Sequence, residues 1–194
     1  MLKINEIYAS IQGESSHTGL PCIFIRLTGC NLRCSWCDTA YAFYAGNDLT
    51  IEETLQKVDT FGLPLVEITG GEPLLQENVY PLMEALLKKG YRVMLETSGA
   101  LPIDKVPQRV IKILDIKCPG SGEEKKNHLE NLKLLSPHDE VKFVLLDRAD
   151  YEWSRDLLRK YDLAPSTQVL FSPVYDKLNL KDLSQWILKD RLAV

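Results

Sequence analysis

Residues 22–39, "CIFIRLTGCNLRCSWCDT", join an apolar, β-branched run to three closely spaced cysteines. The run at 22–29 has the composition of a strand that is buried on both faces. Cys30, Cys34 and Cys37 follow it directly, with the spacing C-x3-C-x2-C. The segment therefore predicts a strand that delivers three thiols to one point at its carboxyl end.

Similar runs recur along the chain and alternate with amphipathic stretches. The other predicted strands are 65–69, 91–97, 110–116, 140–146 and 167–172, and the predicted helices are 50–58, 78–90, 123–135, 149–161 and 180–190. This alternation predicts right-handed crossovers and a parallel sheet. Six strand–helix units are too few to close an eight-fold barrel. We therefore predict an α/β fold, an open partial (β/α)6 barrel, as a single domain over residues 1–194.

Local signals mark two of the helix boundaries. Thr50 with Glu53 three residues later forms a capping-box pattern at the start of one helix. Gly90 follows two lysines, as expected just beyond the end of another. Pro81 is compatible with that helix only if the helix begins close to it.

Polar and glycine-rich sequences follow the ends of four predicted strands. They read "GCNLRC", "GGEP", "SGA" and "KCPG" in chain order. Because the carboxyl ends of parallel strands converge on one face, where active sites are built, residues between 29 and 120 are expected to meet in one pocket.

Composition limits the classes of partner and compartment. The 194 residues carry a net charge of −4 and no lysine or arginine run, which does not favour binding to nucleic-acid phosphates. The N-terminal "MLKINEIYAS" lacks the apolar region of a signal peptide. No window approaches the roughly 18 apolar residues of a membrane helix. We expect a soluble, cytoplasmic protein without nucleic-acid or membrane partners.

The chain has five cysteines, an odd number, and a disulfide framework is not expected in a reducing cytosol. Cys22 and Cys118 are distant from the cluster, and we expect them to pack as small hydrophobic side chains.

Two kinds of metal site compete for the clustered cysteines. Structural zinc takes four closed ligands, but the three histidines of the chain, His17, His128 and His138, have no finger-like spacing from the cysteines. An iron–sulfur cluster usually takes four thiolates. With three thiolates, one iron of a [4Fe–4S] cluster stays open to a small molecule, so the cluster needs no further ligand from the chain.

The pattern C-x3-C-x-aromatic-C, with Trp36 as the aromatic residue, resembles the cluster motif of the radical S-adenosylmethionine (SAM) superfamily. The resemblance implies that the three cysteines bind three irons of a [4Fe–4S] cluster and that SAM chelates the fourth. "TGGEP" (69–73) resembles the GGE motif, whose glycines let the backbone approach the ligand. "ETSG" (96–99) and "DIK" (115–117) fall at the family's ribose and carboxylate contacts. Without the cysteines these segments would suggest only tight turns and a buried ion pair.

A narrower resemblance rests on "IQGE" (11–14), "FIRLTGCNLRC", "WCDT" and "FSPV" (171–174). These segments are similar to the 7-carboxy-7-deazaguanine synthases of queuosine biosynthesis, and the likeness covers nearly the whole chain. It implies a radical SAM lyase that converts 6-carboxy-5,6,7,8-tetrahydropterin to 7-carboxy-7-deazaguanine by ring contraction with loss of ammonia. It also implies a homodimer and a one-electron donor such as flavodoxin. In the implied reaction, the 5′-deoxyadenosyl radical removes a hydrogen from C6 of the pterin and a hydrogen later returns.

The resemblance also assigns site residues. Ile11, Gln12 and Gly13 match the pterin-binding stretch, with Arg26 and Thr69 as further substrate contacts. Gly71, Asp115, Ile116 and Lys117 match SAM contacts, with Glu96 and Ser98 as ribose partners. Thr39 matches the ligand of a magnesium ion, Mg2+.

Two of these assignments can also be weighed from the residues themselves. Arg26 interrupts an apolar strand, so it must be paired or face a cavity, and its planar fork suits a carboxylate. A single threonine hydroxyl is an adequate protein ligand for Mg2+, which keeps waters and substrate oxygens. The alternative for Thr39 is a helix cap.

Two other functions remain in competition. A glycyl-radical-enzyme activase has a similar size and cluster motif, but "IQGE" and "WCDT" argue against it. A non-enzymatic zinc-binding interaction domain would contain zinc without iron and sulfide. Members of the synthase family usually continue into a final strand that helps to close the substrate site. This chain stops at "KDRLAV", so it is either a shortened member or a sequence that ends early.

Overall fold

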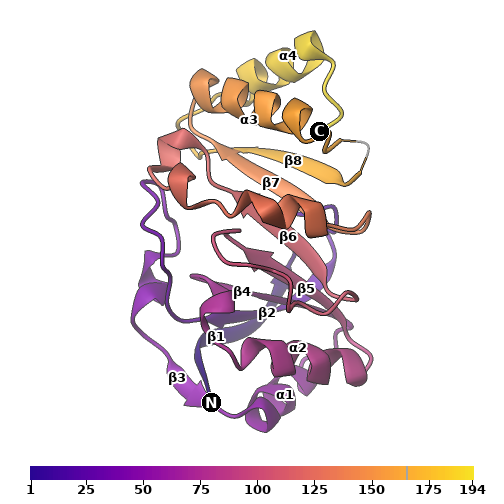
Figure 1. Ribbon diagram of the computed structural model, residues 1–194. Coiled ribbons are helices and arrows are strands. Elements are labelled where there is room, and N and C mark those ends of the chain that lie inside the picture. Colours follow the sequence, from indigo (N-terminus) through magenta and orange to yellow (C-terminus); the bar gives the residue numbers. More distant parts are fainter. Residues whose placement is uncertain (165) are drawn as a thin grey trace.

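Eight strands form one sheet in the computed structural model, which describes residues 1–164 and 166–194 (Figure 1). Their order is β3-β1-β2-β4-β5-β6-β7-β8. The strands are β1 (Leu2–Ile11), β2 (Pro21–Leu27), β3 (Asn47–Leu49), β4 (Leu65–Gly70), β5 (Arg92–Thr97), β6 (Ile111–Ile116), β7 (Glu140–Leu145) and β8 (Gln168–Pro173). The six strands β2 and β4–β8 are parallel, and β1 and β3 add antiparallel pairings at one edge. The six predicted strands and the open parallel sheet are confirmed.

Four α-helices accompany the sheet in the described residues: α1 (Ile51–Asp59), α2 (Val79–Lys88), α3 (Arg148–Lys160) and α4 (Leu180–Asp190). The predicted capping box is present, because the Thr50 side chain accepts from the Glu53 amide and the Glu53 side chain accepts from the Thr50 amide. Pro81 is the third residue of α2, where it removes no intrahelical hydrogen bond. None of these helices is both long and apolar enough to span a bilayer.

The helix predicted at 123–135 is wrong, because this segment forms short 3₁₀ turns at Glu124–Lys126 and Leu129–Leu134. Two asparagines explain the difference. The Asn127 side chain accepts from the Lys117 amide at 2.9 Å and donates to the Lys117 carbonyl at 2.8 Å. The Asn131 side chain accepts from the Ile103 amide and donates to the Gly99 and Leu101 carbonyls. These tertiary bonds replace a continuous helix and hold the loops that follow β5 and β6.

Strand β1 was not predicted, and a β-bulge accounts for this. Leu2 and Ile4 face the main core, and the pairing register with β2 then shifts between Ile4 and Glu6. Beyond the shift Ile7 packs against the same core, whereas Tyr8 packs on the opposite face. An extra residue in one strand switches the side chains that follow to the other face, so the apolar alternation that marks a strand is broken.

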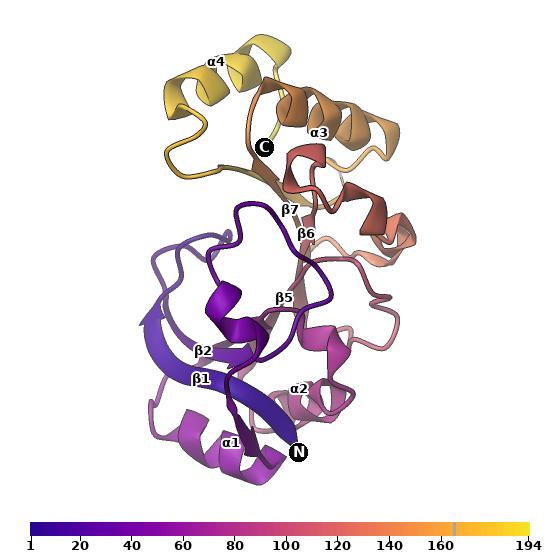
Figure 2. The same cartoon turned by 90° about the vertical axis from the view of Figure 1, so that its left-hand side faces the viewer.

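The parallel strands separate two environments by simple alternation. Ile25, Ile68, Leu95, Leu114 and Phe143 point into the main hydrophobic core. Their neighbours on the other face form what we call the cavity face, namely Phe24 and Arg26 on β2, Glu67 and Thr69 on β4, Glu96 on β5, Ile113 and Asp115 on β6, and Lys142 and Val144 on β7. Successive side chains of a strand point to opposite faces, so the charged side chains of Arg26, Glu67, Glu96, Asp115 and Lys142 lie on one side of the sheet. Figure 2 shows the segment between β2 and β3 in front of the sheet.

Candidate functional site

One cavity of about 370 Å³ lies over the cavity face, near the carboxyl ends of the strands. It contains all three clustered cysteines. The other predicted site residues that line it are Gln12, Gly13, Arg26, Thr39, Thr69, Gly71, Glu96, Ser98, Asp115 and Lys117. The prediction that strand ends gather residues 29–120 in one place is therefore confirmed at the level of geometry.

The segment from residue 28 to residue 39, which we call the cysteine loop, is anchored by neighbours from distant parts of the chain. The Arg33 amide donates to Glu123 Oε1 at 2.7 Å, and the Arg33 guanidinium lies 4.2 Å from the centre of the Phe43 ring. The Ser35 hydroxyl donates to the Gly120 carbonyl at 2.9 Å. Burial raises the pKa of the Cys30 and Cys34 thiols. Cys37 is exposed.

The two glycines of "TGGEP" have a packing role. A Cβ on Gly70 would lie 2.2 Å from the Leu27 carbonyl oxygen, and a Cβ on Gly71 would lie 2.1 Å from the Gly29 carbonyl oxygen and 2.8 Å from the Cys30 Cβ. Such separations are far inside van der Waals contact. The close approach that requires glycine here is thus an approach to the end of β2 for Gly70 and to the cysteine loop for Gly71, and the ligand contact of Gly71 stays a prediction.

Glu72 connects two of the motif loops. Its buried carboxylate accepts from the Leu74 amide at 3.0 Å, from the Thr97 hydroxyl at 2.9 Å and from the Ser98 amide at 2.8 Å. The Ser98 hydroxyl also donates to it at 2.5 Å. Glu72 does cap a short turn, which agrees with the alternative of a tight turn in this segment. It also fixes the loop that carries the predicted ribose partner Ser98.

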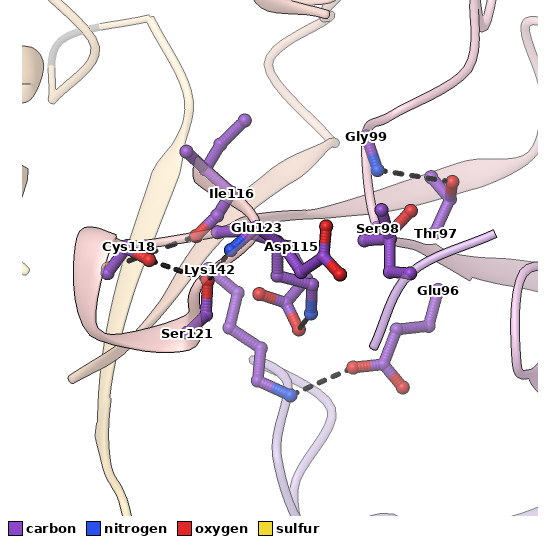
Figure 3. Close-up of polar contacts among 12 residues, drawn as sticks. Glu96, Thr97, Ser98, Gly99, Asp115, Ile116, Cys118, Ser121, Glu123 and Lys142 are labelled. Carbon is purple, nitrogen blue, oxygen red and sulfur yellow. Dashed lines mark hydrogen bonds and ion pairs between the residues drawn. The ribbon is translucent and has the colours of Figure 1, made fainter. Parts of the chain in front are cut away.

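A buried cation organises the acidic wall of the cavity. Lys142 Nζ lies 2.8 Å from Glu96 Oε1, across the intervening strand β6 (Figure 3). Lys142 Nζ also contacts Glu14 Oε2. Burial opposes the charged form of Lys142, but Glu96 and its other acidic neighbours hold the pKa of Lys142 well above its ordinary value. Burial likewise opposes ionisation of Glu96, and Lys142 nevertheless lowers the pKa of that carboxyl. The pair is therefore ionic.

Glu67 behaves in the opposite way. Burial and the nearby charge of Glu96 raise the pKa of Glu67 to about 9, so this carboxyl is neutral at neutral pH. It contacts the Gln12 side-chain amide, whose oxygen accepts from the Glu14 amide at 3.0 Å. Gln12 is itself 3% exposed. Its side chain therefore braces the loop that carries the predicted pterin contacts.

Asp115 and Lys117 form a second ion pair, with 2.7 Å between Lys117 Nζ and Asp115 Oδ2. Burial opposes the charge on Lys117, but Asp115 and Cys34 raise its pKa. The other oxygen, Asp115 Oδ1, is buried and has no hydrogen-bond partner among the described residues. The buried ion pair that the alternative interpretation expected is thus present, but it leaves Asp115 Oδ1 without a donor among the described residues.

Thr39 is not a helix cap. It precedes the 3₁₀ turn Ala40–Phe43, but its side chain makes no capping bond. The hydroxyl instead donates to Asp38 Oδ1 at 2.7 Å. Both side chains line the cavity, so two oxygen groups lie side by side at its wall.

Two predicted site residues are absent from the cavity lining. Ile116 is fully buried in the main core, on the opposite face of β6 from Asp115. The Ile11 side chain is 58% exposed. Any contact of Ile116 to a ligand in the cavity would have to come from its main chain.

Sequence reasoning assigned no role to several cavity residues, above all Lys142, Glu67 and Asp38. A signal existed for the first two. Lys142 and Glu67 are charges inside apolar strand patterns, "EVKFVLL" and "LVEIT", and the reasoning applied to Arg26 applies equally to them. Asp38 carried no such signal.

The zinc alternative finds no support in the geometry. Among the described residues, no three Cys, His, Asp or Glu side chains are grouped around a single metal position. A cluster of several irons does not need such a group, because each cysteine binds a different iron. His17 and His138 lie 3.7 Å from Glu140 and Asp139 respectively. Cys22 and Cys118 are buried in hydrophobic surroundings, as expected.

Comparison with known proteins identifies relatives along the chain. The model of the radical SAM superfamily matches residues 24–117. A 7-carboxy-7-deazaguanine synthase of Koribacter versatilis is 49% identical over all of this chain and 92% of its own length. One from Chlorobaculum tepidum is 44% identical over all of this chain and 89% of its own length.

Solved structures show the same fold. The crystal structure of QueE from Escherichia coli superposes with a TM-score of 0.80 at 24% identity, and the match covers 98% of this chain and 91% of QueE. A structure of TYW1 with a lysine-pyruvate adduct bound matches at a TM-score of 0.59 and 15% identity, over 87% of this chain and 70% of TYW1.

Proposed function

This chain belongs to the 7-carboxy-7-deazaguanine synthase family of radical SAM enzymes, and we propose that its cavity binds 6-carboxy-5,6,7,8-tetrahydropterin beside a [4Fe–4S] cluster and SAM. The reaction is the ring contraction to 7-carboxy-7-deazaguanine with loss of ammonia. The names of the relatives favour this activity over that of a glycyl-radical-enzyme activase. The enzyme is accordingly a radical SAM lyase.

One observation supports this use of the cavity above the others. The clustered cysteines, the predicted SAM contacts Asp115 and Lys117 and the predicted substrate contacts Arg26 and Thr69 line the same 370 Å³ space. Residues far apart in the sequence meet there because five of the six parallel strands, β2 and β4–β7, contribute side chains to the same face.

The residues fit the cofactors that the family implies. Three thiols without a fourth protein ligand suit a cluster whose open iron is bound by SAM. Asp115 Oδ1, a buried acceptor without a partner among the described residues, would cost about 1–3 kcal/mol if nothing bound it. The amine and the ribose hydroxyls of SAM are donors of the required kind. When bound, the reduced cluster and SAM together supply a carbon radical that removes a hydrogen atom.

The chain's own residues bind, orient and shield the substrate in this proposal. The Arg26 fork pairs with the pterin carboxylate, and Thr69 and the main chain of residues 11–13 hold the ring. Lys142 keeps Glu96 ionised and in place. Fixing the ring in this way leaves one C–H bond within reach of the radical, which is a gain from orientation.

A turnover assay tests the proposed function. The protein is reconstituted with iron and sulfide without oxygen, reduced, and given SAM with 6-carboxytetrahydropterin. We expect 7-carboxy-7-deazaguanine and ammonia, identified by chromatography and mass spectrometry, and none from a Cys34→Ser variant. A wild-type protein that contains the cluster, cleaves SAM and still forms no deazaguanine would overturn the proposal.

We also propose that Thr39 binds Mg2+, with Asp38 beside it. Mg2+ prefers oxygen ligands and keeps several waters, so a site with few protein ligands is sufficient. Thr39→Ala should abolish the stimulation of turnover by Mg2+ and leave the iron content unchanged. An unaltered dependence of turnover on Mg2+ concentration would reject the assignment.

Three further properties are proposed from the family. A one-electron donor such as flavodoxin reduces the cluster, the protein is a homodimer, and it works in the cytoplasm. Five free cysteines suit a reducing compartment. Reduction assays with purified flavodoxin and light scattering in solution test the first two properties.

A further inference from the structure

Arg26 is restrained on one edge of its guanidinium by two residues of β1. Arg26 Nε donates to Glu6 Oε1 at 2.7 Å, and Arg26 Nη2 donates to the Tyr8 hydroxyl at 2.9 Å. The side chain of Arg26 is 14% exposed and lines the cavity. Its Nη1 has no hydrogen-bond partner among the residues from 1–164 and 166–194.

A guanidinium offers a carboxylate two parallel pairs of N–H groups, one along its side and one at its end. The side pair comprises Nε–H and one Nη2–H, and it is closed to a ligand because Glu6 already accepts from Nε–H, while Tyr8 accepts one N–H of Nη2. The end pair comprises Nη1–H and the second Nη2–H, and it remains for a ligand. The protein contacts therefore leave one orientation for a bidentate carboxylate.

We propose that Glu6 and Tyr8 are positioning residues that aim the end of the Arg26 fork at the carboxylate of the substrate. The proposal rests on the proposed function, in which Arg26 binds the 6-carboxylate. It deepens that function by naming residues outside the cavity lining that set the geometry of the clamp.

The bulge in β1 is what makes this contact possible. Glu6 lies directly opposite Arg26 in the antiparallel pairing, and the register shift immediately precedes it. With regular alternation from Ile4, Tyr8 would share the core face and Ile7 would face the cavity side. The structure has the reverse, with Ile7 against the core and Tyr8 stacked on Phe24 at 5.2 Å. Bulges commonly re-aim side chains next to active sites.

Tyr41 connects the Glu6 carboxylate to the turn that follows the cysteine loop. Its hydroxyl donates to Glu6 Oε1 at 2.8 Å, and the Arg26 guanidinium lies 5.8 Å from its ring centre. Tyr41 belongs to the 3₁₀ turn that directly follows Thr39. Glu6 thus receives one donor from Arg26 and one from the turn beside the proposed Mg2+ ligand.

The direction in which removal of Glu6 changes the affinity for a carboxylated ligand distinguishes a positioning role from a purely electrostatic one. Glu6 carries a negative charge close to the carboxylate-binding group, so its removal should strengthen the attraction of a ligand carboxylate if charge alone mattered. If Glu6 aims the fork, its removal should weaken binding of a carboxylated ligand. It should leave a ligand without the carboxylate unaffected.

Equilibrium dialysis of the holoenzyme with SAM, without reductant, provides the test. The probes are 6-carboxypterin, an aromatic analogue of the substrate, and pterin, which lacks the carboxylate. For Glu6→Ala we expect the Kd of 6-carboxypterin to rise about tenfold, the size of one hydrogen bond to a charged group. Glu6→Gln keeps an acceptor and should recover part of this loss. Tyr8→Phe and the exposed Tyr41→Phe should each raise that Kd about threefold, a smaller loss because each leaves the ion pair of Glu6 and Arg26 in place.

Controls make each result decisive. Glu52→Ala removes an equal charge from exposed α1 and should change neither Kd. In an Arg26→Ala background, Glu6→Ala should add nothing. Tighter or unchanged binding of 6-carboxypterin by Glu6→Ala, or an equal loss for pterin, overturns the positioning role. If Arg26→Ala itself leaves the preference for 6-carboxypterin over pterin intact, the assigned Arg26 contact has failed instead.

Discussion

Glu67 illustrates at the scale of one residue how the cavity changes chemistry. The side chain is 3% exposed, and burial with the nearby Glu96 raises its pKa to about 9, against an ordinary value of 4.5. Between these two values the folded protein keeps a proton that the unfolded chain has lost. The stabilisation that this proton provides is complete at low pH and is lost as the pH rises through the folded value.

The first prediction follows from this proton. Glu67→Gln keeps the shape of the side chain and an acceptor for Gln12 but cannot ionise. Between about pH 5 and pH 9 the free energy of unfolding of the wild type should fall relative to Glu67→Gln, by at most about 1.4 kcal/mol per pH unit. Urea unfolding of both proteins across this range measures the difference. A constant difference would contradict the assignment of a neutral Glu67.

A second residue-scale prediction concerns Gly71. Because its Cβ would lie 2.1 Å from the Gly29 carbonyl oxygen, Gly71→Ala should displace the cysteine loop and cost about 3 kcal/mol of stability. Iron content after reconstitution should fall as well. Gly13→Ala is the matched control, because neither Gly71 nor Gly13 has positive φ and nothing lies within 4 Å of a Cβ on Gly13. Equal losses in the two variants would show that replacing a glycine, and not the contact with the cysteine loop, is responsible.

For single residues, the sequence indicated which side chains take part in the site better than it indicated which side chains support them. The cysteine spacing, Arg26 and Thr39 could be read because their types are unusual in their surroundings. The functions of Glu6 and Gln12 as supports could not, because each depends on a partner brought close only by the fold. Gln12 meets Glu67, 55 positions away in the chain.

Among the elements, β6 and β7 are joined at their amino ends by a buried ion pair. Asp139 Oδ1 accepts from the Lys112 amide at 2.8 Å, and Lys112 Nζ lies 3.0 Å from Asp139 Oδ2. The Ser136 amide also donates to Asp139 at 2.7 Å. The two side chains are 4% and 0% exposed, so removal of one leaves the other charge without compensation.

We therefore predict that Asp139→Ala lowers the free energy of unfolding by about 3 kcal/mol, as expected for breaking a buried pair. Chemical unfolding monitored by circular dichroism measures this change. Glu130→Ala breaks the exposed pair with Lys133 and should have no measurable effect. A loss in Asp139→Ala no larger than in this control would contradict the structural role of the pair.

The strand and helix patterns predicted most elements, and two of the failures, β1 and the segment 123–135, have physical causes. The parallel strands were readable because each is a continuous apolar run between turn residues. Strand β1 was not, because its bulge breaks the alternation of apolar residues. The segment 123–135 has a helical pattern, but the Asn127 and Asn131 side chains form hydrogen bonds with the loops that follow β6 and β5.

At the scale of the whole molecule, the loop between β1 and β2 crosses the open sheet. This hairpin loop, residues 12–20, begins beside β2 and contacts β7 four strands away. The Ser16 hydroxyl donates to Glu140 Oε1 at 2.5 Å, and Glu14 pairs with Lys142. A partial barrel that cannot close through its strands is thereby bridged by a loop above the cavity.

Hydrogen exchange tests the bridge. Glu140 is 1% exposed and also accepts from the Ser16 amide at 3.2 Å. Glu140→Ala should accelerate exchange of the hairpin-loop amides at least about tenfold, because their local opening becomes easier. Mass spectrometry of peptides covering the loop measures this, with Glu152→Ala on α3 as the control. Unchanged protection of the loop would show that other contacts hold it.

The proposed function requires the cavity to present C6 of the pterin to the radical supplied by SAM. The most direct measurement uses substrate with deuterium at C6 and follows the label by mass spectrometry during anaerobic turnover. We expect deuterium in 5′-deoxyadenosine from the wild type. Formation of 7-carboxy-7-deazaguanine with 5′-deoxyadenosine that carries no deuterium would contradict it.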